Sequence, residues 1–525
     1  MERFDFVIVG SGINSLVCAS MLARAGNSVV VLERNERLGG CVRAEELFPG
    51  YIHEVLSSWY PLFVTSPAYA ALGEDLLTRG VEFVKTDKPT AVITEDGSTL
   101  VFTMDDEENN RRLDELAAGE GERYGAAVGG FFAENSDIAF ALLGNEVWGR
   151  KTARALYKDW RKRGLLGTFT FFGESLETCR TWLERDFRSE LTRALIAPWV
   201  LHAGLGPDDA YSGMMGKLII GTVTLAGMPL VEGGSARLID AFRQLIEDNG
   251  GKTVTNADVD VVIIENGRAN GVATATGDAY GAEAAVICNV TPTQLYGRLL
   301  RDASVPSDVK SRADSYRYGR SDMQIHFALN QAPEWEHPEL EDVAMVHLTP
   351  GLDGVSGAVN EAERGLLPHA PTIVVGQPTS ADPSRAPEDG SILWIQLQEL
   401  PARIKGDARG EIPVPPDGSW TEEVRERYAD RIQARLGVHI KNLDSALVGR
   451  RAFSPADLEN INMNLIGGDP YSGACTIDQF LVWRPMPGSK NHETAVKDLY
   501  HIGASTHPGP GLGGGSGFMV ASRFV

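Results

Sequence analysis

Residues 4 to 43 decide the fold, with the sequence FDFVIVGSGINSLVCASMLARAGNSVVVLERNERLGGCVR. Phe6 to Val9 is a short apolar run typical of a buried parallel strand, and the turn Gly10-Ser11-Gly12 follows at once. Ile13 to Ala25 carries apolar residues at helical spacing, and Ser28 to Leu32 is a second strand. A strand, a glycine turn, a helix and a second strand in this order predict a dinucleotide-binding βαβ unit.

The spacing of this motif has a chemical reason. Gly10 permits a tight turn, and Gly12 lets the backbone approach a pyrophosphate, whose charge the N-terminus of the helix can hold. The third glycine of the usual pattern is Ser15, and we expect a small residue to be tolerated there. Glu33 ends the second strand, where a carboxylate can bind ribose hydroxyls. Arg34 is placed to meet a 2′-phosphate, so the motif alone leaves FAD, NAD and NADP open. A glycine turn in a non-binding βαβ unit is the alternative.

The composition limits the class of protein. A chain of 525 residues, 43% hydrophobic and 23% charged, predicts a globular protein with two or more domains. Its net charge of −22 argues against nucleic acid and against an electrostatic grip on anionic lipid. The five cysteines are too far apart for a CxxC pair or a zinc cluster, so no metal site is predicted and a reducing, cytoplasmic location is favoured.

Three stretches bear on membranes. Phe6 to Ala23 lacks charge, but the βαβ unit explains it better than a signal peptide does. Leu218 to Val231 is uncharged and too short to span a bilayer, which leaves a peripheral membrane contact open. It belongs to a Met- and Gly-rich stretch, 211 to 231, that fits either an apolar pocket or core filling. Lys151 to Gly164 is a basic amphipathic stretch, for which a solvated helix face is favoured over a membrane or acidic-partner surface.

The rest of the chain alternates helical and strand patterns. Helices are expected at 105–119, 151–164, 175–201, 235–248 and 420–436 and from 518 onward. Strands are expected from 259, at 271–275, 284–289, 322–329, 372–375, 392–397 and 499–502. A long glycine turn, 503 to 517, contains a formal GxGxxG spacing, but no βαβ acid follows it, so we predict no second nucleotide site there.

Several of these motifs together resemble one known family. The segments GSGINS, LERNERLGG, EGGSARL, VDVVIIENGRANGV and LYHIGASTHPGPGLGGGSG are similar to those of the phytoene desaturase family of FAD-dependent oxidoreductases, in the branch that holds bacterial carotenoid ketolases. The resemblance implies an α/β protein with a Rossmann-like FAD-binding domain of the glutathione-reductase type and an inserted mixed α+β substrate domain. The implied FAD domain comprises 1–60, 228–290 and 491–525, and the substrate domain comprises 61–227 and 291–490.

The resemblance also implies which residues hold FAD. They are Gly10, Gly12, Ser15, Glu33, Arg34, Gly39, Gly40, Val259, Gly503, Ala504, Thr506 and His507. Gly39 and Gly40 would flank the diphosphate, Val259 would contact adenine through its backbone, and the segment from Gly503 to His507 would lie along the ribityl chain and flavin. Related flavoproteins often carry an acid after the glycine that matches Gly503. Here the residue is Ala504, so backbone groups must bind the ribityl chain.

The expected activity is oxidation of an apolar small molecule. A hydride would pass from a C–H carbon of a polyene or isoprenoid-like substrate to flavin N5, giving desaturation or oxidation. His507 and His202 are candidate bases, although a structural hydrogen bond or a core position explains each as well. No second βαβ unit is evident in the sequence, so oxygen or a quinone is the expected electron acceptor. A flavin amine oxidase and a non-catalytic partner-binding protein, as in guanine-nucleotide dissociation inhibitors, are the alternatives, and the oligomeric state stays open.

Overall fold

A seven-stranded sheet built from three distant parts of the chain forms the first half of the molecule. The computed structural model describes residues 2–525. The strand order is β10-β11-β12-β1-β2-β9, and β20 pairs with β12. Strands β20, β12, β1, β2 and β9 run parallel, and the hairpin β10-β11 continues the sheet antiparallel. The strands are β1 (Glu2–Val9), β2 (Val29–Leu32), β9 (Lys252–Val254), β10 (Val259–Glu265), β11 (Arg268–Thr274), β12 (Ala279–Asn289) and β20 (Leu499–Ile502).

The predicted βαβ unit is confirmed at the centre of this sheet. Helix α1 (Ile13–Arg24) begins directly after the glycine turn, and β1 pairs in register with β2. Helices α11 (Ala236–Asp248) and α17 (Gly515–Ala521) pack with α1 against one face, where their buried side chains form one apolar core with β1 and β2. Side chains of β1, β2, β10 and β12 form a second core on the other face. A parallel sheet covered on both faces confirms the α/β fold class.

A second seven-stranded sheet organises the other half of the molecule. Its order is β19-β13-β17-β16-β14-β6-β7. One face packs on the amphipathic helix α15 (Glu422–His439), which the Thr421 side chain caps. The opposite face is covered by helices α8 (Cys179–Asp186), α9 (Glu190–Ile196) and α10 (Ser212–Ala226). The strands are β6 (Thr90–Thr94), β7 (Thr99–Phe102), β13 (Ser321–Leu329), β14 (Met345–Thr349), β16 (Ile373–Gly376), β17 (Ser391–Leu400) and β19 (Leu447–Phe453).

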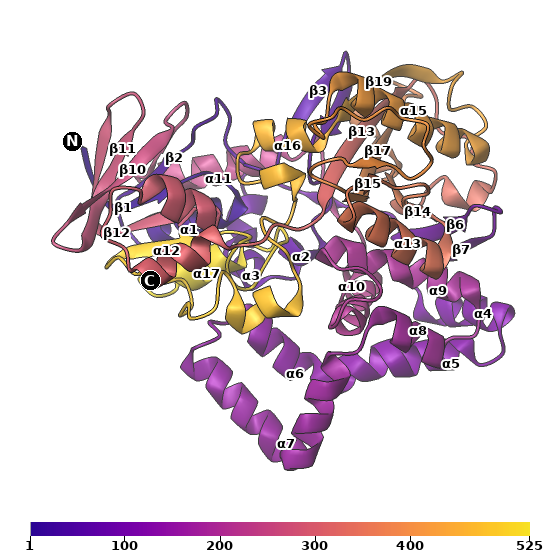
Figure 1. Cartoon of the computed structure of the whole chain (residues 1–525), viewed down its shortest axis with the longest axis horizontal. Helices are drawn as coiled ribbons and strands as arrows, with labels where there is room; N and C mark the ends of the chain where they lie inside the picture. The colour runs from indigo at the N-terminus through magenta and orange to yellow at the C-terminus, as the bar shows by residue number, and fades with distance from the viewer. Residues whose placement is uncertain (1) are drawn as a thin grey trace.

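Helices connect and flank the two sheets, and α6 and α7 project from the rest of the molecule (Figure 1). Within α7, Gly164 has φ 70° and ψ 178°, so the helix bends there into two limbs. The remaining helices are α2 (Pro61–Val64), α3 (Pro67–Leu77), α4 (Asp106–Leu116), α5 (Glu120–Tyr124), α6 (Gly130–Gly144), α7 (Arg150–Ser175), α8 (Cys179–Asp186), α9 (Glu190–Ile196), α10 (Ser212–Ala226), α12 (Ser307–Asp314), α13 (Gly351–Glu363), α14 (Pro378–Ala381) and α16 (Pro455–Ile461). Short strands are β3 (Ala44–Phe48), β4 (Tyr51–Glu54), β5 (Phe83–Val84), β8 (Leu230–Val231), β15 (Leu366–Leu367) and β18 (Gly406–Asp407).

Two expectations from the sequence are corrected. The sequence predicts the last helix from Phe518, but it starts at Gly515, because Gly517 packs directly on the backbone of Asn14 in α1 and no larger residue would fit. The single helix expected at 175–201 is divided into α8, α9 and a 3-10 helix at 197–203. In the uncharged stretch from Leu218, Ile220 and Val223 of α10 are buried beneath the second sheet, whereas Leu225 is exposed, so a peripheral membrane contact there stays a prediction. The domain boundaries given above stay a prediction.

Candidate functional site

A buried carboxylate ties together the glycine turn and the end of β2. The Glu33 Oε2 atom accepts hydrogen bonds from the Ser11 backbone N–H at 3.0 Å and the Ser11 hydroxyl at 2.6 Å. The Oε1 atom accepts from the Asn35 backbone N–H at 2.9 Å. The Ser11 Oγ atom in turn accepts from the Gly39 amide at 3.0 Å. Gly10 has φ +84°, a conformation that glycine adopts without strain. These bonds hold the turn, the acid and the second glycine pair in one fixed arrangement.

The glycines at this site let two backbone segments touch. Gly12 forms a bridge with Gly39, and a Cβ atom at Gly40 would lie 3.1 Å from the Gly12 Cα atom. The N-terminus of α1 starts at this point, and the first-turn N–H groups of a helix have no partner within it. Bare backbone and free N–H groups are what an anionic pyrophosphate needs.

Asn289, at the end of β12, is a site residue that the sequence motifs do not indicate. Its amide donates to the Ser15 hydroxyl at 2.9 Å. A Cβ atom at Gly12 would lie 3.1 Å from the Asn289 Nδ2 atom, and one at Gly503 would strike the Asn289 Oδ1 atom. Asn289 therefore stands between the two glycine turns, and Ser15 serves as its hydrogen-bond partner.

The C-terminal glycine turn reaches the same place. Gly503 follows β20, has φ +110° and donates its amide to the Ser516 hydroxyl at 2.9 Å. That hydroxyl donates to the Asn14 Oδ1 atom at 2.8 Å, which joins α17 to the first turn of α1. Thr506 closes the turn by donating its hydroxyl to the Gly503 carbonyl at 2.9 Å. The two ends of the chain thus form one site.

A buried arginine, Arg484, is hydrogen-bonded to Ala504, the position at which related flavoproteins often carry an acid. The Arg484 guanidinium is 3% exposed and donates to the carbonyls of Ala504 at 2.8 Å and Tyr471 at 2.9 Å. Within residues 2–525 it forms no ion pair. The buried Asp469 is close enough to interact with this positive charge, which lies against the segment from Gly503 to His507.

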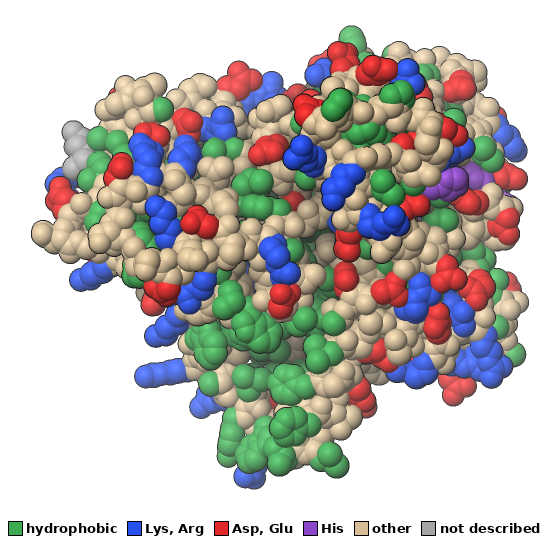
Figure 2. All heavy atoms as spheres, in the orientation of Figure 1, with side chains coloured by type: hydrophobic (Ala, Val, Ile, Leu, Met, Phe, Trp, Pro, Cys, Tyr) green, Lys and Arg blue, Asp and Glu red, His purple; other side chains and the backbone are tan. Residues whose placement is uncertain are grey.

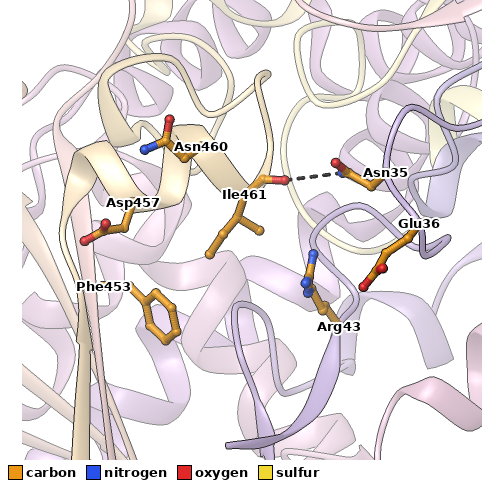
Figure 3. Close-up of a pocket in the computed structure, with 7 residues that line it drawn as sticks. All are labelled: Asn35, Glu36, Arg43, Phe453, Asp457, Asn460 and Ile461. Carbon is orange, nitrogen blue, oxygen red and sulfur yellow. Dashed lines mark hydrogen bonds between the residues drawn. The ribbon is translucent and has the colours of Figure 1, made fainter. Parts of the chain in front are cut away.

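An asparagine-rich segment, Asn460 to Asn464, lies across the site from the other half of the chain. Asn462 donates to the Cys41 sulfur at 3.4 Å, and Asn464 accepts from the Thr291 amide at 3.1 Å. Beside it is a cavity of about 360 Å³, shown in Figure 3. It is lined by Asn35, Glu36, Arg43, Phe453, Asp457, Asn460 and Ile461. The Asn35 side-chain amide donates to the Ile461 carbonyl at 3.4 Å across this cavity (Figure 3), and the Asn35 backbone N–H donates to Glu33.

Comparison with known proteins identifies the family to which this site belongs. A model of the flavin containing amine oxidoreductase family matches residues 16–397. The chain belongs to this family. The relatives include a limonene dehydrogenase subunit of Castellaniella defragrans, 24% identical over 99% of this chain and 94% of that protein. Pyridine nucleotide-disulfide oxidoreductase domain-containing protein 2 of Rattus norvegicus is 25% identical over 99% of this chain and 93% of that protein. The zeta-carotene-forming phytoene desaturase of Myxococcus xanthus is 26% identical over 99% of this chain and 92% of that protein. These relatives confirm the resemblance that the motifs suggested.

Solved structures agree on the fold. Putrescine oxidase bound to putrescine superposes with a TM-score of 0.62 at 15% identity, covering 99% of each chain. An oxidoreductase from Methanosarcina mazei gives a TM-score of 0.60 at 18% identity, again covering 99% of each chain. As a member of the flavin containing amine oxidoreductase family, the present chain has FAD as its cofactor.

The described residues fit FAD. The turn of Gly10 and Gly12 with Gly40 would hold the pyrophosphate, Glu33 would bind the ribose, and the segment from Gly503 to Thr506 would lie along the ribityl chain and flavin. Ser58 and Trp59 supply a further indication, because the Ser58 hydroxyl and the Trp59 indole N–H are buried with no hydrogen-bond partner in residues 2–525. A buried polar atom that lacks a partner within the protein can bond to a ligand.

Two predicted contacts lie at the edge of the site. Arg34 is exposed next to Glu33. Val259 begins β10 and is buried, and its carbonyl accepts from the Arg298 Nη1 atom at 2.9 Å. Contact between these residues and adenosine stays a prediction.

The structure separates the two candidate bases. The His507 Nε2 atom pairs with the Asn145 carbonyl at 3.1 Å, and burial lowers the pKa of His507 to about 4. His202 lies 3.0 Å, Nε2 to Nε2, from His347, and both rings pack on Trp199. Burial lowers the pKa of His202 to about 4 and that of His347 well below its usual value. His507 is thus engaged with the backbone, whereas His202 belongs to a neutral pair beneath the second sheet.

Proposed function

We propose that this chain is an FAD-dependent oxidoreductase that forms or oxidises a carbon–carbon double bond in an apolar, isoprenoid-like substrate. The observation that carries the proposal is the aromatic core beneath the second sheet, which reaches the FAD-binding turn where Phe480 packs on Arg484. The relatives support it by their names, because limonene and phytoene are hydrocarbons.

Tryptophan side chains make up much of this core near Trp59, which lies in the segment that follows β4. The Trp59 ring packs edge-to-face on Trp394 with centroids 5.2 Å apart, and the Trp394 indole donates to the Leu56 carbonyl at 3.0 Å. Gly376 of β16 leaves the space that the Trp59 indole fills. Both tryptophans belong to one apolar core with Trp199, Met345 and Phe480. Side chains of this kind suit contact with a hydrocarbon and exclude water.

The titratable side chains on this face of the sheet favour their neutral forms. Asp322 is buried, accepts from the Gln396 amide at 2.6 Å, and has its pKa raised well above the usual value by burial. Burial lowers the pKa of His326 to about 4. An ammonium substrate would need an ionised carboxylate as its partner, and these groups do not offer one. This arrangement favours a hydrocarbon over an amine.

The protein's contribution to the reaction is positioning, dryness and proton handling. When bound, FAD supplies a hydride acceptor at its N5 atom. In this proposal the tryptophans would orient an apolar chain and keep water out. His202 remains our candidate for taking a proton, at its Nδ1 atom, because its Nε2 atom is already hydrogen-bonded to His347. We propose oxygen or a quinone as the final electron acceptor.

The test is anaerobic mixing of the FAD-loaded protein with substrates of two kinds. We expect limonene or phytoene, dispersed in detergent, to bleach the flavin absorption and to yield a product lighter by two hydrogens. Putrescine is the comparison substrate. Bleaching by putrescine and not by either hydrocarbon would overturn the proposal and establish an amine oxidase. Admitting oxygen or a soluble quinone afterwards identifies the acceptor by the rate at which the flavin colour returns.

A further inference from the structure

The helical arm formed by α6 and α7 exposes apolar side chains that the rest of the protein leaves uncovered. Of the eighteen large apolar side chains exposed in residues 2–525, ten lie between residues 140 and 176. They are Phe140, Trp148, Leu156, Tyr157, Trp160, Leu165, Leu166, Phe169, Phe172 and Leu176. Figure 2 shows the resulting apolar surface over the arm. Contiguous exposed apolar surface marks a site of interaction with a protein or a membrane.

The bend at Gly164 divides α7 into two chemically different limbs. The first limb, Arg150 to Arg163, contains seven lysines and arginines and one acid, Asp159. The ten residues from Gly164 to Gly173 carry no charge. At the bend, Leu165 is 65% exposed and Leu166 is 81% exposed, the largest value among the large apolar side chains of residues 2–525. Helix α7 turns at the tip of the arm (Figure 1).

Most of the basic charge on the first limb is free. Arg163 is bound to Asp159 at 2.8 Å, and Lys158 lies 3.2 Å from Asp137. In the part of the chain that the structure describes, no acid pairs with Arg150, Lys151, Arg154 or Arg161. This cluster stands out on a chain whose net charge is −22. Exposed cations beside an uncharged apolar tip match the two layers of a membrane surface, which are anionic headgroups and acyl chains.

The helix that packs against α7 has the same character. The continuous helical stretch Glu120–Gly144 is long and apolar enough to cross a membrane by length and composition, yet only 22% of its most apolar window is buried. It is fixed to the body at its start, where Tyr124 packs on Phe102 and a glycine, Gly221, gives Phe132 room against α10. The arm is therefore anchored at its base and unburied along its length.

We propose that the α6–α7 arm docks this protein on an anionic lipid surface, with the tip from Leu165 to Phe172 inserted among the acyl chains and the basic limb on the headgroups. A second copy of the chain fits this surface less well. Joining two arms through their apolar tips would bring two basic limbs together, and the exposed apolar residues outside the arm are scattered. This docking does not depend on the identity of the substrate.

The experiment is vesicle flotation of the full-length FAD-loaded protein. We compare vesicles of phosphatidylcholine with vesicles that also contain phosphatidylglycerol. Two variants divide the surface: a tip variant, Leu165→Ser with Leu166→Ser and Phe169→Ser, and a limb variant, Lys151→Gln with Arg154→Gln and Arg161→Gln. The control variant, Leu77→Ser with Val438→Ser and Val448→Ser, removes three exposed apolar side chains elsewhere. Retained flavin absorption confirms that each variant is folded.

We expect the wild-type protein and the control variant to float with anionic vesicles and to be released by high salt. The tip variant should bind at least about tenfold more weakly at every salt concentration. The limb variant should lose the preference for anionic vesicles. Absence of the wild-type protein from both kinds of vesicle, or equal binding to both, would overturn the proposal. A dimer in solution that the tip variant converts to a monomer would also overturn it, because a second copy would then cover the tip.

Discussion

The Asn289 side-chain amide donates to the Ser15 hydroxyl at 2.9 Å, across 274 residues of sequence. This bond joins the end of β12 to the first turn of α1. It places an uncharged amide between the turn at Gly12 and the turn at Gly503. At this position an uncharged hydrogen-bond donor can face a pyrophosphate without repelling it.

Asn289→Asp should therefore weaken FAD binding strongly. A carboxylate at this position would repel the pyrophosphate and lose the donor to Ser15, so we expect FAD affinity to fall by roughly tenfold or more, which corresponds to about 1.4 kcal/mol. FAD fluorescence titration of the apoprotein measures the change. Asn110→Asp adds the same charge on the surface helix α4 and should leave FAD affinity unchanged. Equal affinities for the two variants would remove Asn289 from the site.

Glu33→Gln should weaken both FAD binding and folding. Three donors converge on the Glu33 carboxylate, and an amide would turn an N–H group toward at least one of them. A buried donor without an acceptor costs about 1 to 3 kcal/mol, which should appear in the free energy of unfolding in urea. Glu74→Gln, at an exposed position of α3, is the control. Unchanged stability in the Glu33 variant would contradict this account of the site.

The sequence predicts those parts of the site whose residues lie close together along the chain. The glycine turn, the helix and the acid at Glu33 follow one another within thirty residues, and β20 is predicted with its observed bounds because apolar residues and a glycine turn delimit it. Asn289 could not be found in this way. A single asparagine at a strand end has no local pattern, and its role exists only because β12 pairs with β1.

Long-range packing also explains the other differences. Gly515 to Gly517 is typical of a turn by composition, but close contact with α1 favours glycine inside a helix there. The lack of charge from Leu218 onward is compatible with a membrane contact, yet that helix is largely buried. The surface that does expose apolar residues lies in α7, whose basic first half resembles an ordinary solvated helix. The asparagines at 460, 462 and 464 form a regular spacing that could have drawn attention to that segment.

Arg484→Met should make the midpoint potential of the bound flavin more negative. A buried positive charge against the flavin-binding turn favours the more electron-rich reduced state, and methionine removes that charge. Arg484→Lys keeps the charge and should shift the potential less. Equilibrium titration against a redox dye gives the values. Arg317→Met, which removes an exposed arginine paired with Asp478, should have no effect. If all four proteins share one potential, the charge of Arg484 does not act on the flavin.

Gly517→Ala and Gly437→Ala should have opposite effects on stability. A Cβ atom at Gly517 would collide with the Asn14 backbone, so the two helices must separate, at a cost of about 1 to 3 kcal/mol. At Gly437, in α15, a Cβ atom meets nothing within 4 Å, and alanine should stabilise by about 0.4 to 1 kcal/mol. Urea denaturation of both variants measures the difference. Destabilisation by Gly437→Ala equal to that by Gly517→Ala would show that the α1–α17 contact is not special.

The free energy of unfolding should fall as the pH drops from 7 to 5. Burial lowers the pKa of His202, His326 and His507 to about 4 and that of His53 to about 2, below the 6.5 of an exposed histidine. At these histidines the native state therefore binds fewer protons than the unfolded state does, and the histidines outnumber the buried acids Asp322 and Glu399, whose raised pKa acts in the opposite direction. The contribution of each histidine is complete above pH 6.5 and is lost as the pH falls below it. Each should cost about 1 to 2 kcal/mol over this range.

His53→Phe isolates one of these contributions. Neither ring nitrogen of His53 has a hydrogen-bond partner in the described residues, so phenylalanine removes the titration without breaking a bond. Urea denaturation at pH 7 and pH 5 should show that His53→Phe loses about 1 to 2 kcal/mol less on acidification than the wild-type protein does. His369→Phe, at an exposed position, should keep the wild-type pH dependence. A pH dependence that His53→Phe leaves intact would mean that His53 does not stay neutral in the native protein at pH 5.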